Sequence, residues 1–162
     1  MGKILTSIFL FFFINQQLNA IEIYGAAKVI DGDSVHINSK KIRLEGIDAP
    51  EIKQKCKKSF LKISAIVGFE FKKSYSCGVI SKSKLFEKIS GAKIKCISLS
   101  RDKYKRYLST CYKNKINLNK WMVRNGYAVA YKRYSKDYVR DEEYAKENKL
   151  GIWEGSFIIP ER

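Results

Sequence analysis

Residues 30–51, which read IDGDSVHINSKKIRLEGIDAPE, carry acidic groups at both ends and an arginine between them. The candidates for chemistry are Asp31, Asp33, Arg43, Asp48 and Glu51. Carboxylate oxygens are the ligands that hard cations such as calcium prefer, and a guanidinium forms paired hydrogen bonds to phosphate oxygens. These residue types therefore indicate a site that holds a hard cation against a phosphate group.

A β-hairpin would bring the two ends of this segment together. Ser34–Asn38 and Lys41–Leu44 show the period-two alternation of strands, and the Asn-Ser-Lys sequence at 38–40 is typical of a turn. Antiparallel pairing about that turn places the first two aspartates near the last two acidic residues. Arg43 alternates with two apolar residues, so we expect it to point away from the apolar face.

The rest of the chain predicts an α+β fold. Further strands are expected at Ile21–Ile30, Lys93–Ser98 and Arg106–Tyr112, with an extended run at Tyr127–Tyr131. Helices are expected at Gly78–Ser90, Leu118–Asn125 and Lys136–Leu150, followed by a packed tail, Ile152–Arg162, anchored by Trp153. Five short strands with a helix between the third and the fourth is the order of an OB-fold, here a five-stranded β-barrel with about three α-helices.

Residues 52–76 show no clear periodicity, and the apolar patch at 63–71 fits a helix or a strand equally well. We expect an insertion that packs on the surface of the domain. The helix at 78–90 is expected to turn one apolar stripe toward the core, made of Val79, Ile80, Leu85, Phe86 and Ile89.

The N-terminus has the three parts of a secretory signal peptide, namely Lys3, the apolar run Ile4–Ile14 and a polar stretch that ends at Ala20. Cleavage after Ala20 divides the chain into a signal peptide, 1–20, and a domain, 21–162. An uncleaved anchor is the alternative, but the apolar run is shorter than the roughly 20 residues of a spanning helix. We therefore expect a secreted or periplasmic protein without a membrane span after cleavage.

The chain is strongly basic, with 32 Lys plus Arg against 16 Asp plus Glu. Loss of residues 1–20 removes one lysine, so the domain has a formal charge of 31 minus 16, or +15. Such an excess indicates an anionic partner, and nucleic acid, anionic lipid and acidic polysaccharide are all candidates. A lysine-rich genome is the alternative explanation that needs no binding role.

Four cysteines lie after residue 20, an even number that favours two disulfides in an oxidising compartment. Three pairings are possible. Cys96 and Cys111 fall on two strands that a turn near 101–105 would place opposite one another, so we expect Cys96–Cys111 together with Cys56–Cys77. A zinc site is the competing interpretation, but there is no CxxC pair and only one histidine, His36.

Four motifs, in order, resemble the staphylococcal nuclease, or thermonuclease, family. They are VIDGDS at 29–34, RLEGIDAPE at 43–51, DKYKR at 102–106 and NKLGIW at 148–153. The cysteines and the long insertion are similar to those of exported, cysteine-containing relatives. The motifs span most of the chain after residue 20, which makes the resemblance specific, whereas DGD alone is commonly a turn.

The resemblance implies a calcium-dependent endonuclease that hydrolyses phosphodiester bonds of DNA and RNA and leaves 3′-phosphate ends. Its calcium ligands fall on the carboxylates of Asp33 and Asp48 and on the backbone carbonyl of Ala49. Glu51 takes the role of serving the attacking water, as a general base or as an orienting acceptor.

The phosphate-holding roles of the family fall on Arg43 and Arg106, which stay protonated and suit a developing dianion. Lys103, Tyr104 and Tyr131 resemble the side chains that contact the nucleotide, with a one-residue gap near Tyr131. We expect a preference for single strands, whose bases stack on exposed tyrosines, and a monomer without a stable protein partner.

Two other functions are compatible with parts of the sequence. A non-catalytic OB-fold module would bind nucleic acid without cleaving it, and a cationic surface-binding or membrane-binding protein would need the charge alone. The presence of Arg43, Glu51 and Arg106 argues against the first. The lack of a strongly amphipathic basic helix other than the charged C-terminal one argues against the second.

Overall fold

The computed structural model describes residues 20–63 and 69–158, so the expected signal peptide lies outside the described residues. Five strands form a closed mixed barrel in the order β3-β2-β1-β7-β8, and a parallel pairing of β3 with β8 closes it. They are β1 (Ile21–Val29), β2 (Ser34–Ile37), β3 (Lys40–Leu44), β7 (Lys93–Arg101) and β8 (Tyr107–Lys113). This arrangement confirms the predicted OB-fold.

The β2–β3 hairpin follows from its sequence. Asn38 and Ser39 occupy the two-residue turn with φ of 48° and 65°, the positive values that tight hairpin turns require. Alternate side chains of the two strands then face the barrel interior, and Val35, Ile37 and Ile42 are fully buried there. The apolar face of the hairpin therefore fixes its register, and a shift by one residue would expose the core.

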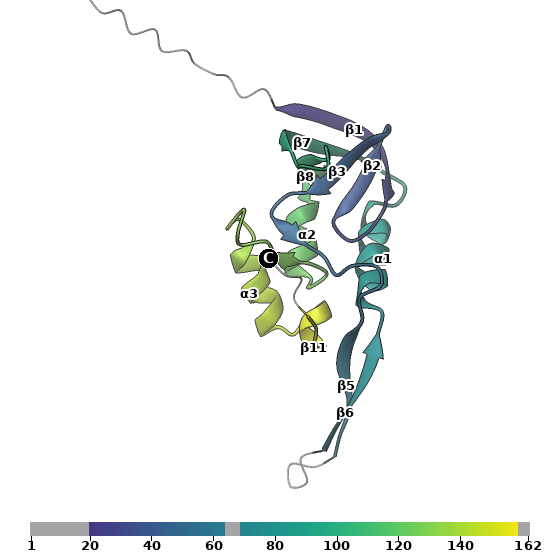
Figure 1. The fold of residues 1–162 in the computed structure, drawn as a ribbon, viewed down its shortest axis with the longest axis vertical. Helices are drawn as coiled ribbons and strands as arrows, with labels where there is room; N and C mark the ends of the chain where they lie inside the picture. Colours follow the sequence, from purple (N-terminus) through teal and green to yellow (C-terminus); the bar gives the residue numbers. More distant parts are fainter. Residues whose placement is uncertain (1–19, 64–68, 159–162) are drawn as a thin grey trace, which may run out of the picture.

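Three helices pack beside and below the barrel, as Figure 1 shows. They are α1 (Cys77–Ile89), α2 (Leu118–Arg124) and α3 (Val139–Glu147), followed by the 3₁₀ helix η1 (Gly151–Glu154). The side chain of Asn117 caps α2 by accepting from the N–H of Lys120. Short strands complete the fold: β4 (Ile47–Asp48) pairs with β10 (Val129–Ala130), and β9 (Ile116–Asn117) pairs with β8.

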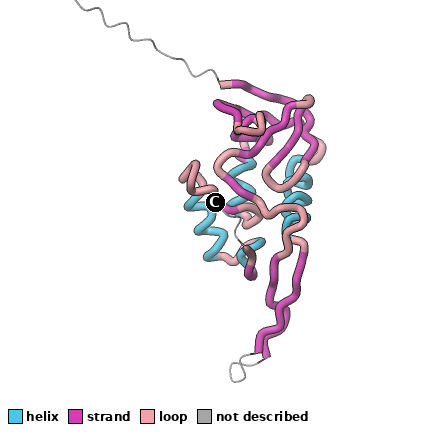
Figure 2. The backbone as a smooth tube through the Cα atoms, in the orientation of Figure 1, coloured by secondary structure: helices cyan, strands magenta, loops and turns pink. Residues whose placement is uncertain are grey.

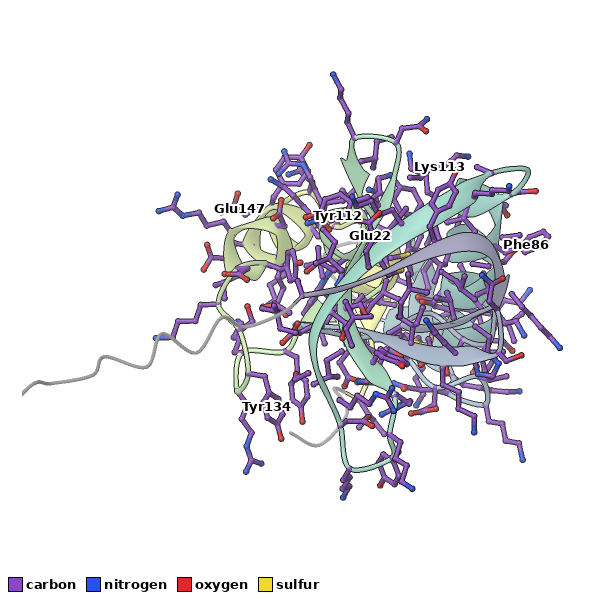
Figure 3. All side chains as sticks on the ribbon, turned by 90° about the horizontal axis from the view of Figure 1, so that it is seen from above. Glu22, Phe86, Tyr112, Lys113, Tyr134 and Glu147 are labelled. Carbon is purple, nitrogen blue, oxygen red and sulfur yellow. A yellow bond between two sulfur atoms is a disulfide. The ribbon has the colours of Figure 1, made fainter. Side chains whose placement is uncertain are left out.

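The predicted apolar stripe of α1 is partly wrong. Leu85 and Ile89 are buried, but Val79, Ile80 and Phe86 are 50%, 41% and 57% exposed. Figure 3 shows Phe86 at the outer edge of the molecule. The small residues near the start of the helix face the core instead. They are Cys77, Gly78 and Ser81, and other chain segments approach the helix closely there.

Within residues 52–76, which we call the arm, the described strands β5 (Cys56–Ile63) and β6 (Phe69–Tyr75) pair antiparallel. The expectation of an insertion packed on the domain surface is wrong, because the arm projects from the barrel and helices as a long ladder (Figure 2). Its base is fixed by pairing of β5 with β11 (Gly155–Ser156). Its alternation was masked in the sequence by a register shift between Ser59 and Leu61.

Both expected disulfides are present. Cys96–Cys111 joins directly opposite residues of β7 and β8, and Cys56–Cys77 joins the first residue of β5 to the first residue of α1. Disulfides are typical of proteins outside the reducing cytoplasm. No helix within the described residues is long and apolar enough to cross a membrane.

The C-terminal segment differs in detail from its prediction. Helix α3 begins at Val139 rather than Lys136, and the tail is anchored mainly by Ile152, which is 4% exposed. Trp153 is half-buried and packs edge-on against Phe157. Residues 159–162 of the predicted tail lie outside the described residues.

Candidate active site

Arg43 lies between two carboxylates that the sequence keeps 15 residues apart. Its Nη1 donates to Asp33 Oδ1 at 3.0 Å, and its Nη2 donates to Asp48 Oδ1 at 2.8 Å. The β2–β3 register, with Ser34 opposite Arg43, sets the first contact, and the short β4 strand carries Asp48 back to the same place. The predicted hairpin thus brings three of the proposed site residues into direct contact.

Asp33 is held from several directions although it is only 4% exposed. Besides Arg43, the hydroxyl of Ser34 donates to its Oδ1 at 2.9 Å, and the N–H of Ala49 donates to its Oδ2 at 3.1 Å. Burial raises the pKa of the Asp33 carboxyl to about 7, although the contacts with Arg43, Ala49 and Ser34 act to lower it. The site therefore carries a carboxylate that favours a cationic partner.

The guanidinium of Arg43 stays protonated between the carboxylates of Asp33 and Asp48. Burial acts to lower its pKa, but the carboxylates of Asp33 and Asp48 outweigh that effect and leave the pKa raised. A permanently protonated group between two acids holds their positions in the absence of a cation. It also presents a donor at the place where the resemblance puts a phosphate.

Close packing explains the glycine of the Asp-Gly-Asp sequence. A Cβ at Gly32 would lie 2.0 Å from Ser81 Oγ and 2.6 Å from the Cβ of Ala49, so a side chain does not fit. The same Ser81 hydroxyl donates to the carbonyl of Tyr127 at 2.7 Å, which fixes α1 against the loop. Asp31 Oδ1 accepts from the N–H of Asp33, the turn contact that such sequences commonly make.

Glu51 lies on a loop whose backbone is tied down while its side chain is exposed. Its carbonyl accepts from the N–H of Gln54 at 2.8 Å, and its N–H donates to Gln54 Oε1 at 3.2 Å. The carbonyl also packs against Gly78, where an added Cβ would lie 1.8 Å away. The loop therefore presents Glu51 to solvent from a fixed backbone, three residues beyond Asp48.

Arg106 is held by its own turn rather than by the Asp33 cluster. Its Nε and Nη2 both lie 2.7 Å from Asp102 Oδ2. Burial acts to raise the pKa of Asp102, but hydrogen bonds from the backbone and side chain of Arg106 outweigh it and lower that pKa. In the parallel β3–β8 pairing Arg43 lies opposite Leu108, so Arg106 comes two residues before that position, directly before β8 begins.

The expected nucleotide-contacting residues lie on the Arg106 turn and next to β4. Tyr104 is 65% exposed beside Arg106, whose guanidinium carbon lies 5.4 Å from its ring centroid, and Lys103 lies on the same turn. The N–H of Tyr131 donates to the carbonyl of Gly46, next to β4. The Tyr131 ring packs edge-on against Tyr134, which points outward from the loop before α3 (Figure 3).

The donor set fits calcium better than zinc. Asp33 and Asp48 offer carboxylate oxygens in one place, and calcium completes its loose coordination with carbonyls and water. All four cysteines are in disulfides, and no three His, Cys, Asp or Glu side chains form a metal cage among the residues that the structure describes. Ala49 contacts Asp33 through its backbone N–H, and the proposed ligand role of its carbonyl stays a prediction.

One further residue, Asn119, supports the site and was not predicted from the sequence. Asn119 is fully buried, and its side chain donates to the carbonyls of Glu45 and Ser109 and accepts from the N–H of Cys111. It therefore links α2 to the strand segment that leads from Arg43 to Asp48. An asparagine at the second position of a helix gave no sequence signal that distinguished it from a surface residue.

Residues 41–155 match the model of the family described as staphylococcal nuclease homologue. The chain belongs to the staphylococcal nuclease family. It is 33% identical over 134 residues to the succinoglycan biosynthesis protein ExoI of Rhizobium meliloti, a match that covers 81% of this chain and 64% of that protein. It is 30% identical over 161 residues to an uncharacterized endonuclease of Haemophilus influenzae, covering 93% of this chain and 77% of the relative.

A plant protein gives a similar match. The probable staphylococcal-like nuclease CAN3 of Oryza sativa is 28% identical over 123 residues, which cover 75% of this chain and 27% of that protein. The family and these names support nuclease activity. The matched region includes every residue of the site from Arg43 onward, while the Asp-Gly-Asp loop precedes the segment that the family model covers.

Proposed function

We propose that this protein is a calcium-dependent endonuclease that hydrolyses phosphodiester bonds of DNA and RNA and leaves 3′-phosphate ends. The observation that carries the proposal is the bridging of Asp33 and Asp48 by Arg43, in a chain of the staphylococcal nuclease family. The carboxylates of Asp33 and Asp48, with the carbonyl of Ala49, would hold the cation. The bound ion would supply neutralisation of charge on the phosphoryl oxygens.

The remaining roles are proposed as the family resemblance implies them. Glu51, exposed on a fixed loop, accepts a proton from the water that attacks phosphorus or orients that water. Arg43 and Arg106 donate to the phosphate oxygens as charge accumulates on them, and removal of such a donor typically lowers the rate about 10²-fold or more. The bond between phosphorus and the 5′ oxygen breaks, so the phosphate stays on the 3′ side and the 5′ oxygen takes up a proton.

The charge and the exposed rings suit a polyanionic strand. The basic surface attracts the phosphate backbone with little sequence selectivity, and binding weakens with salt. Single-stranded regions are preferred because unpaired bases can stack on Tyr104 and Tyr131. We propose a monomer that acts outside the cytoplasm, in the periplasm or the medium, after cleavage at Ala20.

The test is cleavage of single-stranded DNA and RNA by the purified protein, with calcium and with excess chelator, and analysis of the product ends. We expect calcium-dependent cutting that leaves 3′-phosphates. The Asp48→Asn substitution should raise the calcium concentration needed for half-maximal rate, whereas Glu143→Gln, on the exposed surface of α3, should not. Binding of nucleic acid without cutting under any divalent ion would favour the non-catalytic OB-fold module instead.

A further inference from the structure

One face of the arm alternates aromatic and basic side chains. The register of β5 with β6 places Cys56 opposite Tyr75 and Lys58 opposite Lys73. Successive side chains of a strand point to opposite faces, so Phe71, Lys73 and Tyr75 lie on one face, about 6.7 Å apart. Lys72 points to the other face. Phe71 is 47% exposed although it is large and apolar.

The arm is strongly basic. Residues 52–76 contain seven lysines and a single acidic residue, Glu70. Lys58 and Lys73 are directly opposite one another, a like-charge pair that destabilises a two-stranded ladder. Lys58 also forms an ion pair with Glu154, which compensates part of that repulsion. A bound anion near Lys73 would relieve the remainder.

The same face leads into a pocket of about 370 Å³ at the base of the arm. Tyr75 and Lys58 of the arm line it together with Lys84 of α1, Tyr127 and Glu154. Two tyrosine rings and two lysines are thus among the lining groups, and such groups accept a nucleobase and its phosphate. The pocket lies apart from Arg43 and its carboxylates, none of which lines it.

The base of the arm is rigid and is continuous with the Glu51 loop. The Cys56–Cys77 disulfide and the pairing of Lys57 and Lys58 with β11 fix its lower end. Gln54 connects the two regions, since it hydrogen-bonds the backbone of Glu51 on one side and its carbonyl accepts from the N–H of Gly78 on the other. A strand held by the arm is therefore held at a fixed place relative to Glu51.

We infer that the Phe71–Lys73–Tyr75 face of the arm, with the pocket at its base, is a second binding surface for single-stranded nucleic acid. It holds the substrate strand away from the scissile phosphate by stacking of bases on the rings and by contact of phosphates with lysines. The inference rests on the proposed nuclease function and extends it. It accounts for a long projecting hairpin whose described part packs on the remainder of the protein at its base.

The test measures the dissociation constant of a fluorescent 20-nucleotide single strand in excess chelator, so that binding is observed without cleavage. Phe71→Ser/Lys73→Gln is compared with the matched control Phe86→Ser/Lys72→Gln. The control removes an exposed phenylalanine from α1 and a lysine from the opposite face of the same strand. We expect the first variant to bind about tenfold more weakly, the effect of losing one stacked base, while the control stays within twofold.

Two further readouts separate the arm from the catalytic site. The slope of log affinity against log salt should fall by about 0.7 in Phe71→Ser/Lys73→Gln, the value for one lost phosphate contact to a single strand. Calcium-dependent cleavage of a dinucleotide substrate, which offers only the scissile phosphate and its two nucleosides, should be unchanged in both variants. Equal affinities of the two variants, or a loss confined to binding of anionic lipid vesicles, would overturn the inference and leave the nuclease proposal standing. Failure of the unsubstituted protein to cleave would overturn the nuclease proposal itself.

Discussion

Replacement of Arg43 by methionine should destabilise the protein in a strongly pH-dependent way. The substitution keeps most of the side-chain volume but removes the charge between Asp33 and Asp48, and it leaves two carboxylates facing each other. Removal of one partner from a buried ion pair costs about 3–5 kcal/mol. Because the Arg43 side chain keeps 19% of its surface exposed, we expect about 3 kcal/mol at pH 8 in chelator.

The pH dependence follows from the raised pKa of Asp33. Its folded-state value of about 7 lies above the value of 3.8 for an unperturbed aspartate, so protonation of Asp33 favours the folded state. That contribution is complete below pH 3.8 and is lost as the pH rises through 7. Without the guanidinium the pKa of Asp33 rises further, so protonation relieves the repulsion at pH 5. The deficit of Arg43→Met should then fall to about 1–2 kcal/mol.

Thermal and urea unfolding of both proteins at pH 5 and pH 8, in chelator and in calcium, measures these values. A deficit of about 3 kcal/mol corresponds to roughly 6–12 °C in the midpoint for a protein of this size. Calcium at pH 8 should restore part of the loss, since a cation replaces the missing charge. Arg124→Met is the control: that arginine pairs with Asp141 from a position 46% exposed, and we expect at most about 1 kcal/mol. A deficit under about 1 kcal/mol at pH 8, or the same deficit at pH 5, would refute the reasoning.

Three other substitutions test parts of the same account. Gly32→Ala should lower stability by about 1–3 kcal/mol and activity more than tenfold, because its Cβ would overlap Ser81; normal unfolding and cleavage would contradict the packing. Asn119→Ala should cost about 3 kcal/mol in urea unfolding, since it leaves buried backbone groups without partners, and a loss under 1 kcal/mol would show that water replaces them. Asp102→Asn weakens the hold on Arg106, so the cleavage rate should fall several-fold while stability falls by at most about 1 kcal/mol, and an unchanged rate would remove Asp102 from the account.

The sequence predicted the barrel and the Arg43 cluster because both depend on local patterns. Alternation in Ser34–Leu44 and a two-residue turn determine the hairpin, and the hairpin determines the contact between Arg43 and Asp33. The Cys96–Cys111 pairing was predictable for the same reason, since one hairpin register places the two residues opposite each other. Such patterns involve only a few neighbouring residues, so they can be recognised in a single sequence.

The arm and the core face of α1 were not predictable in the same way. In the arm, a register shift breaks the alternation, and the strands have no barrel interior that would impose one apolar face. In α1, Ser81 is buried because its hydroxyl reaches the carbonyl of Tyr127, a tertiary contact with no local signature. Val79 and Phe86 have the spacing of a core stripe but lie on the outer side. Hydrophobicity alone does not identify the buried face when a close backbone approach requires small residues.

The measurement that tests the central claim most directly is the single-turnover cleavage rate of a labelled single strand in saturating calcium. It compares the unsubstituted protein with Glu51→Gln and Arg106→Ala, and with Glu143→Gln and Arg140→Ala as matched surface controls. The account predicts that Glu51→Gln and Arg106→Ala lower the rate about 10²-fold or more, while the two controls stay within twofold. Binding of the strand in chelator should be unchanged in Glu51→Gln. Cleavage at the unsubstituted rate by Glu51→Gln and Arg106→Ala would contradict the assignment of the site to these residues.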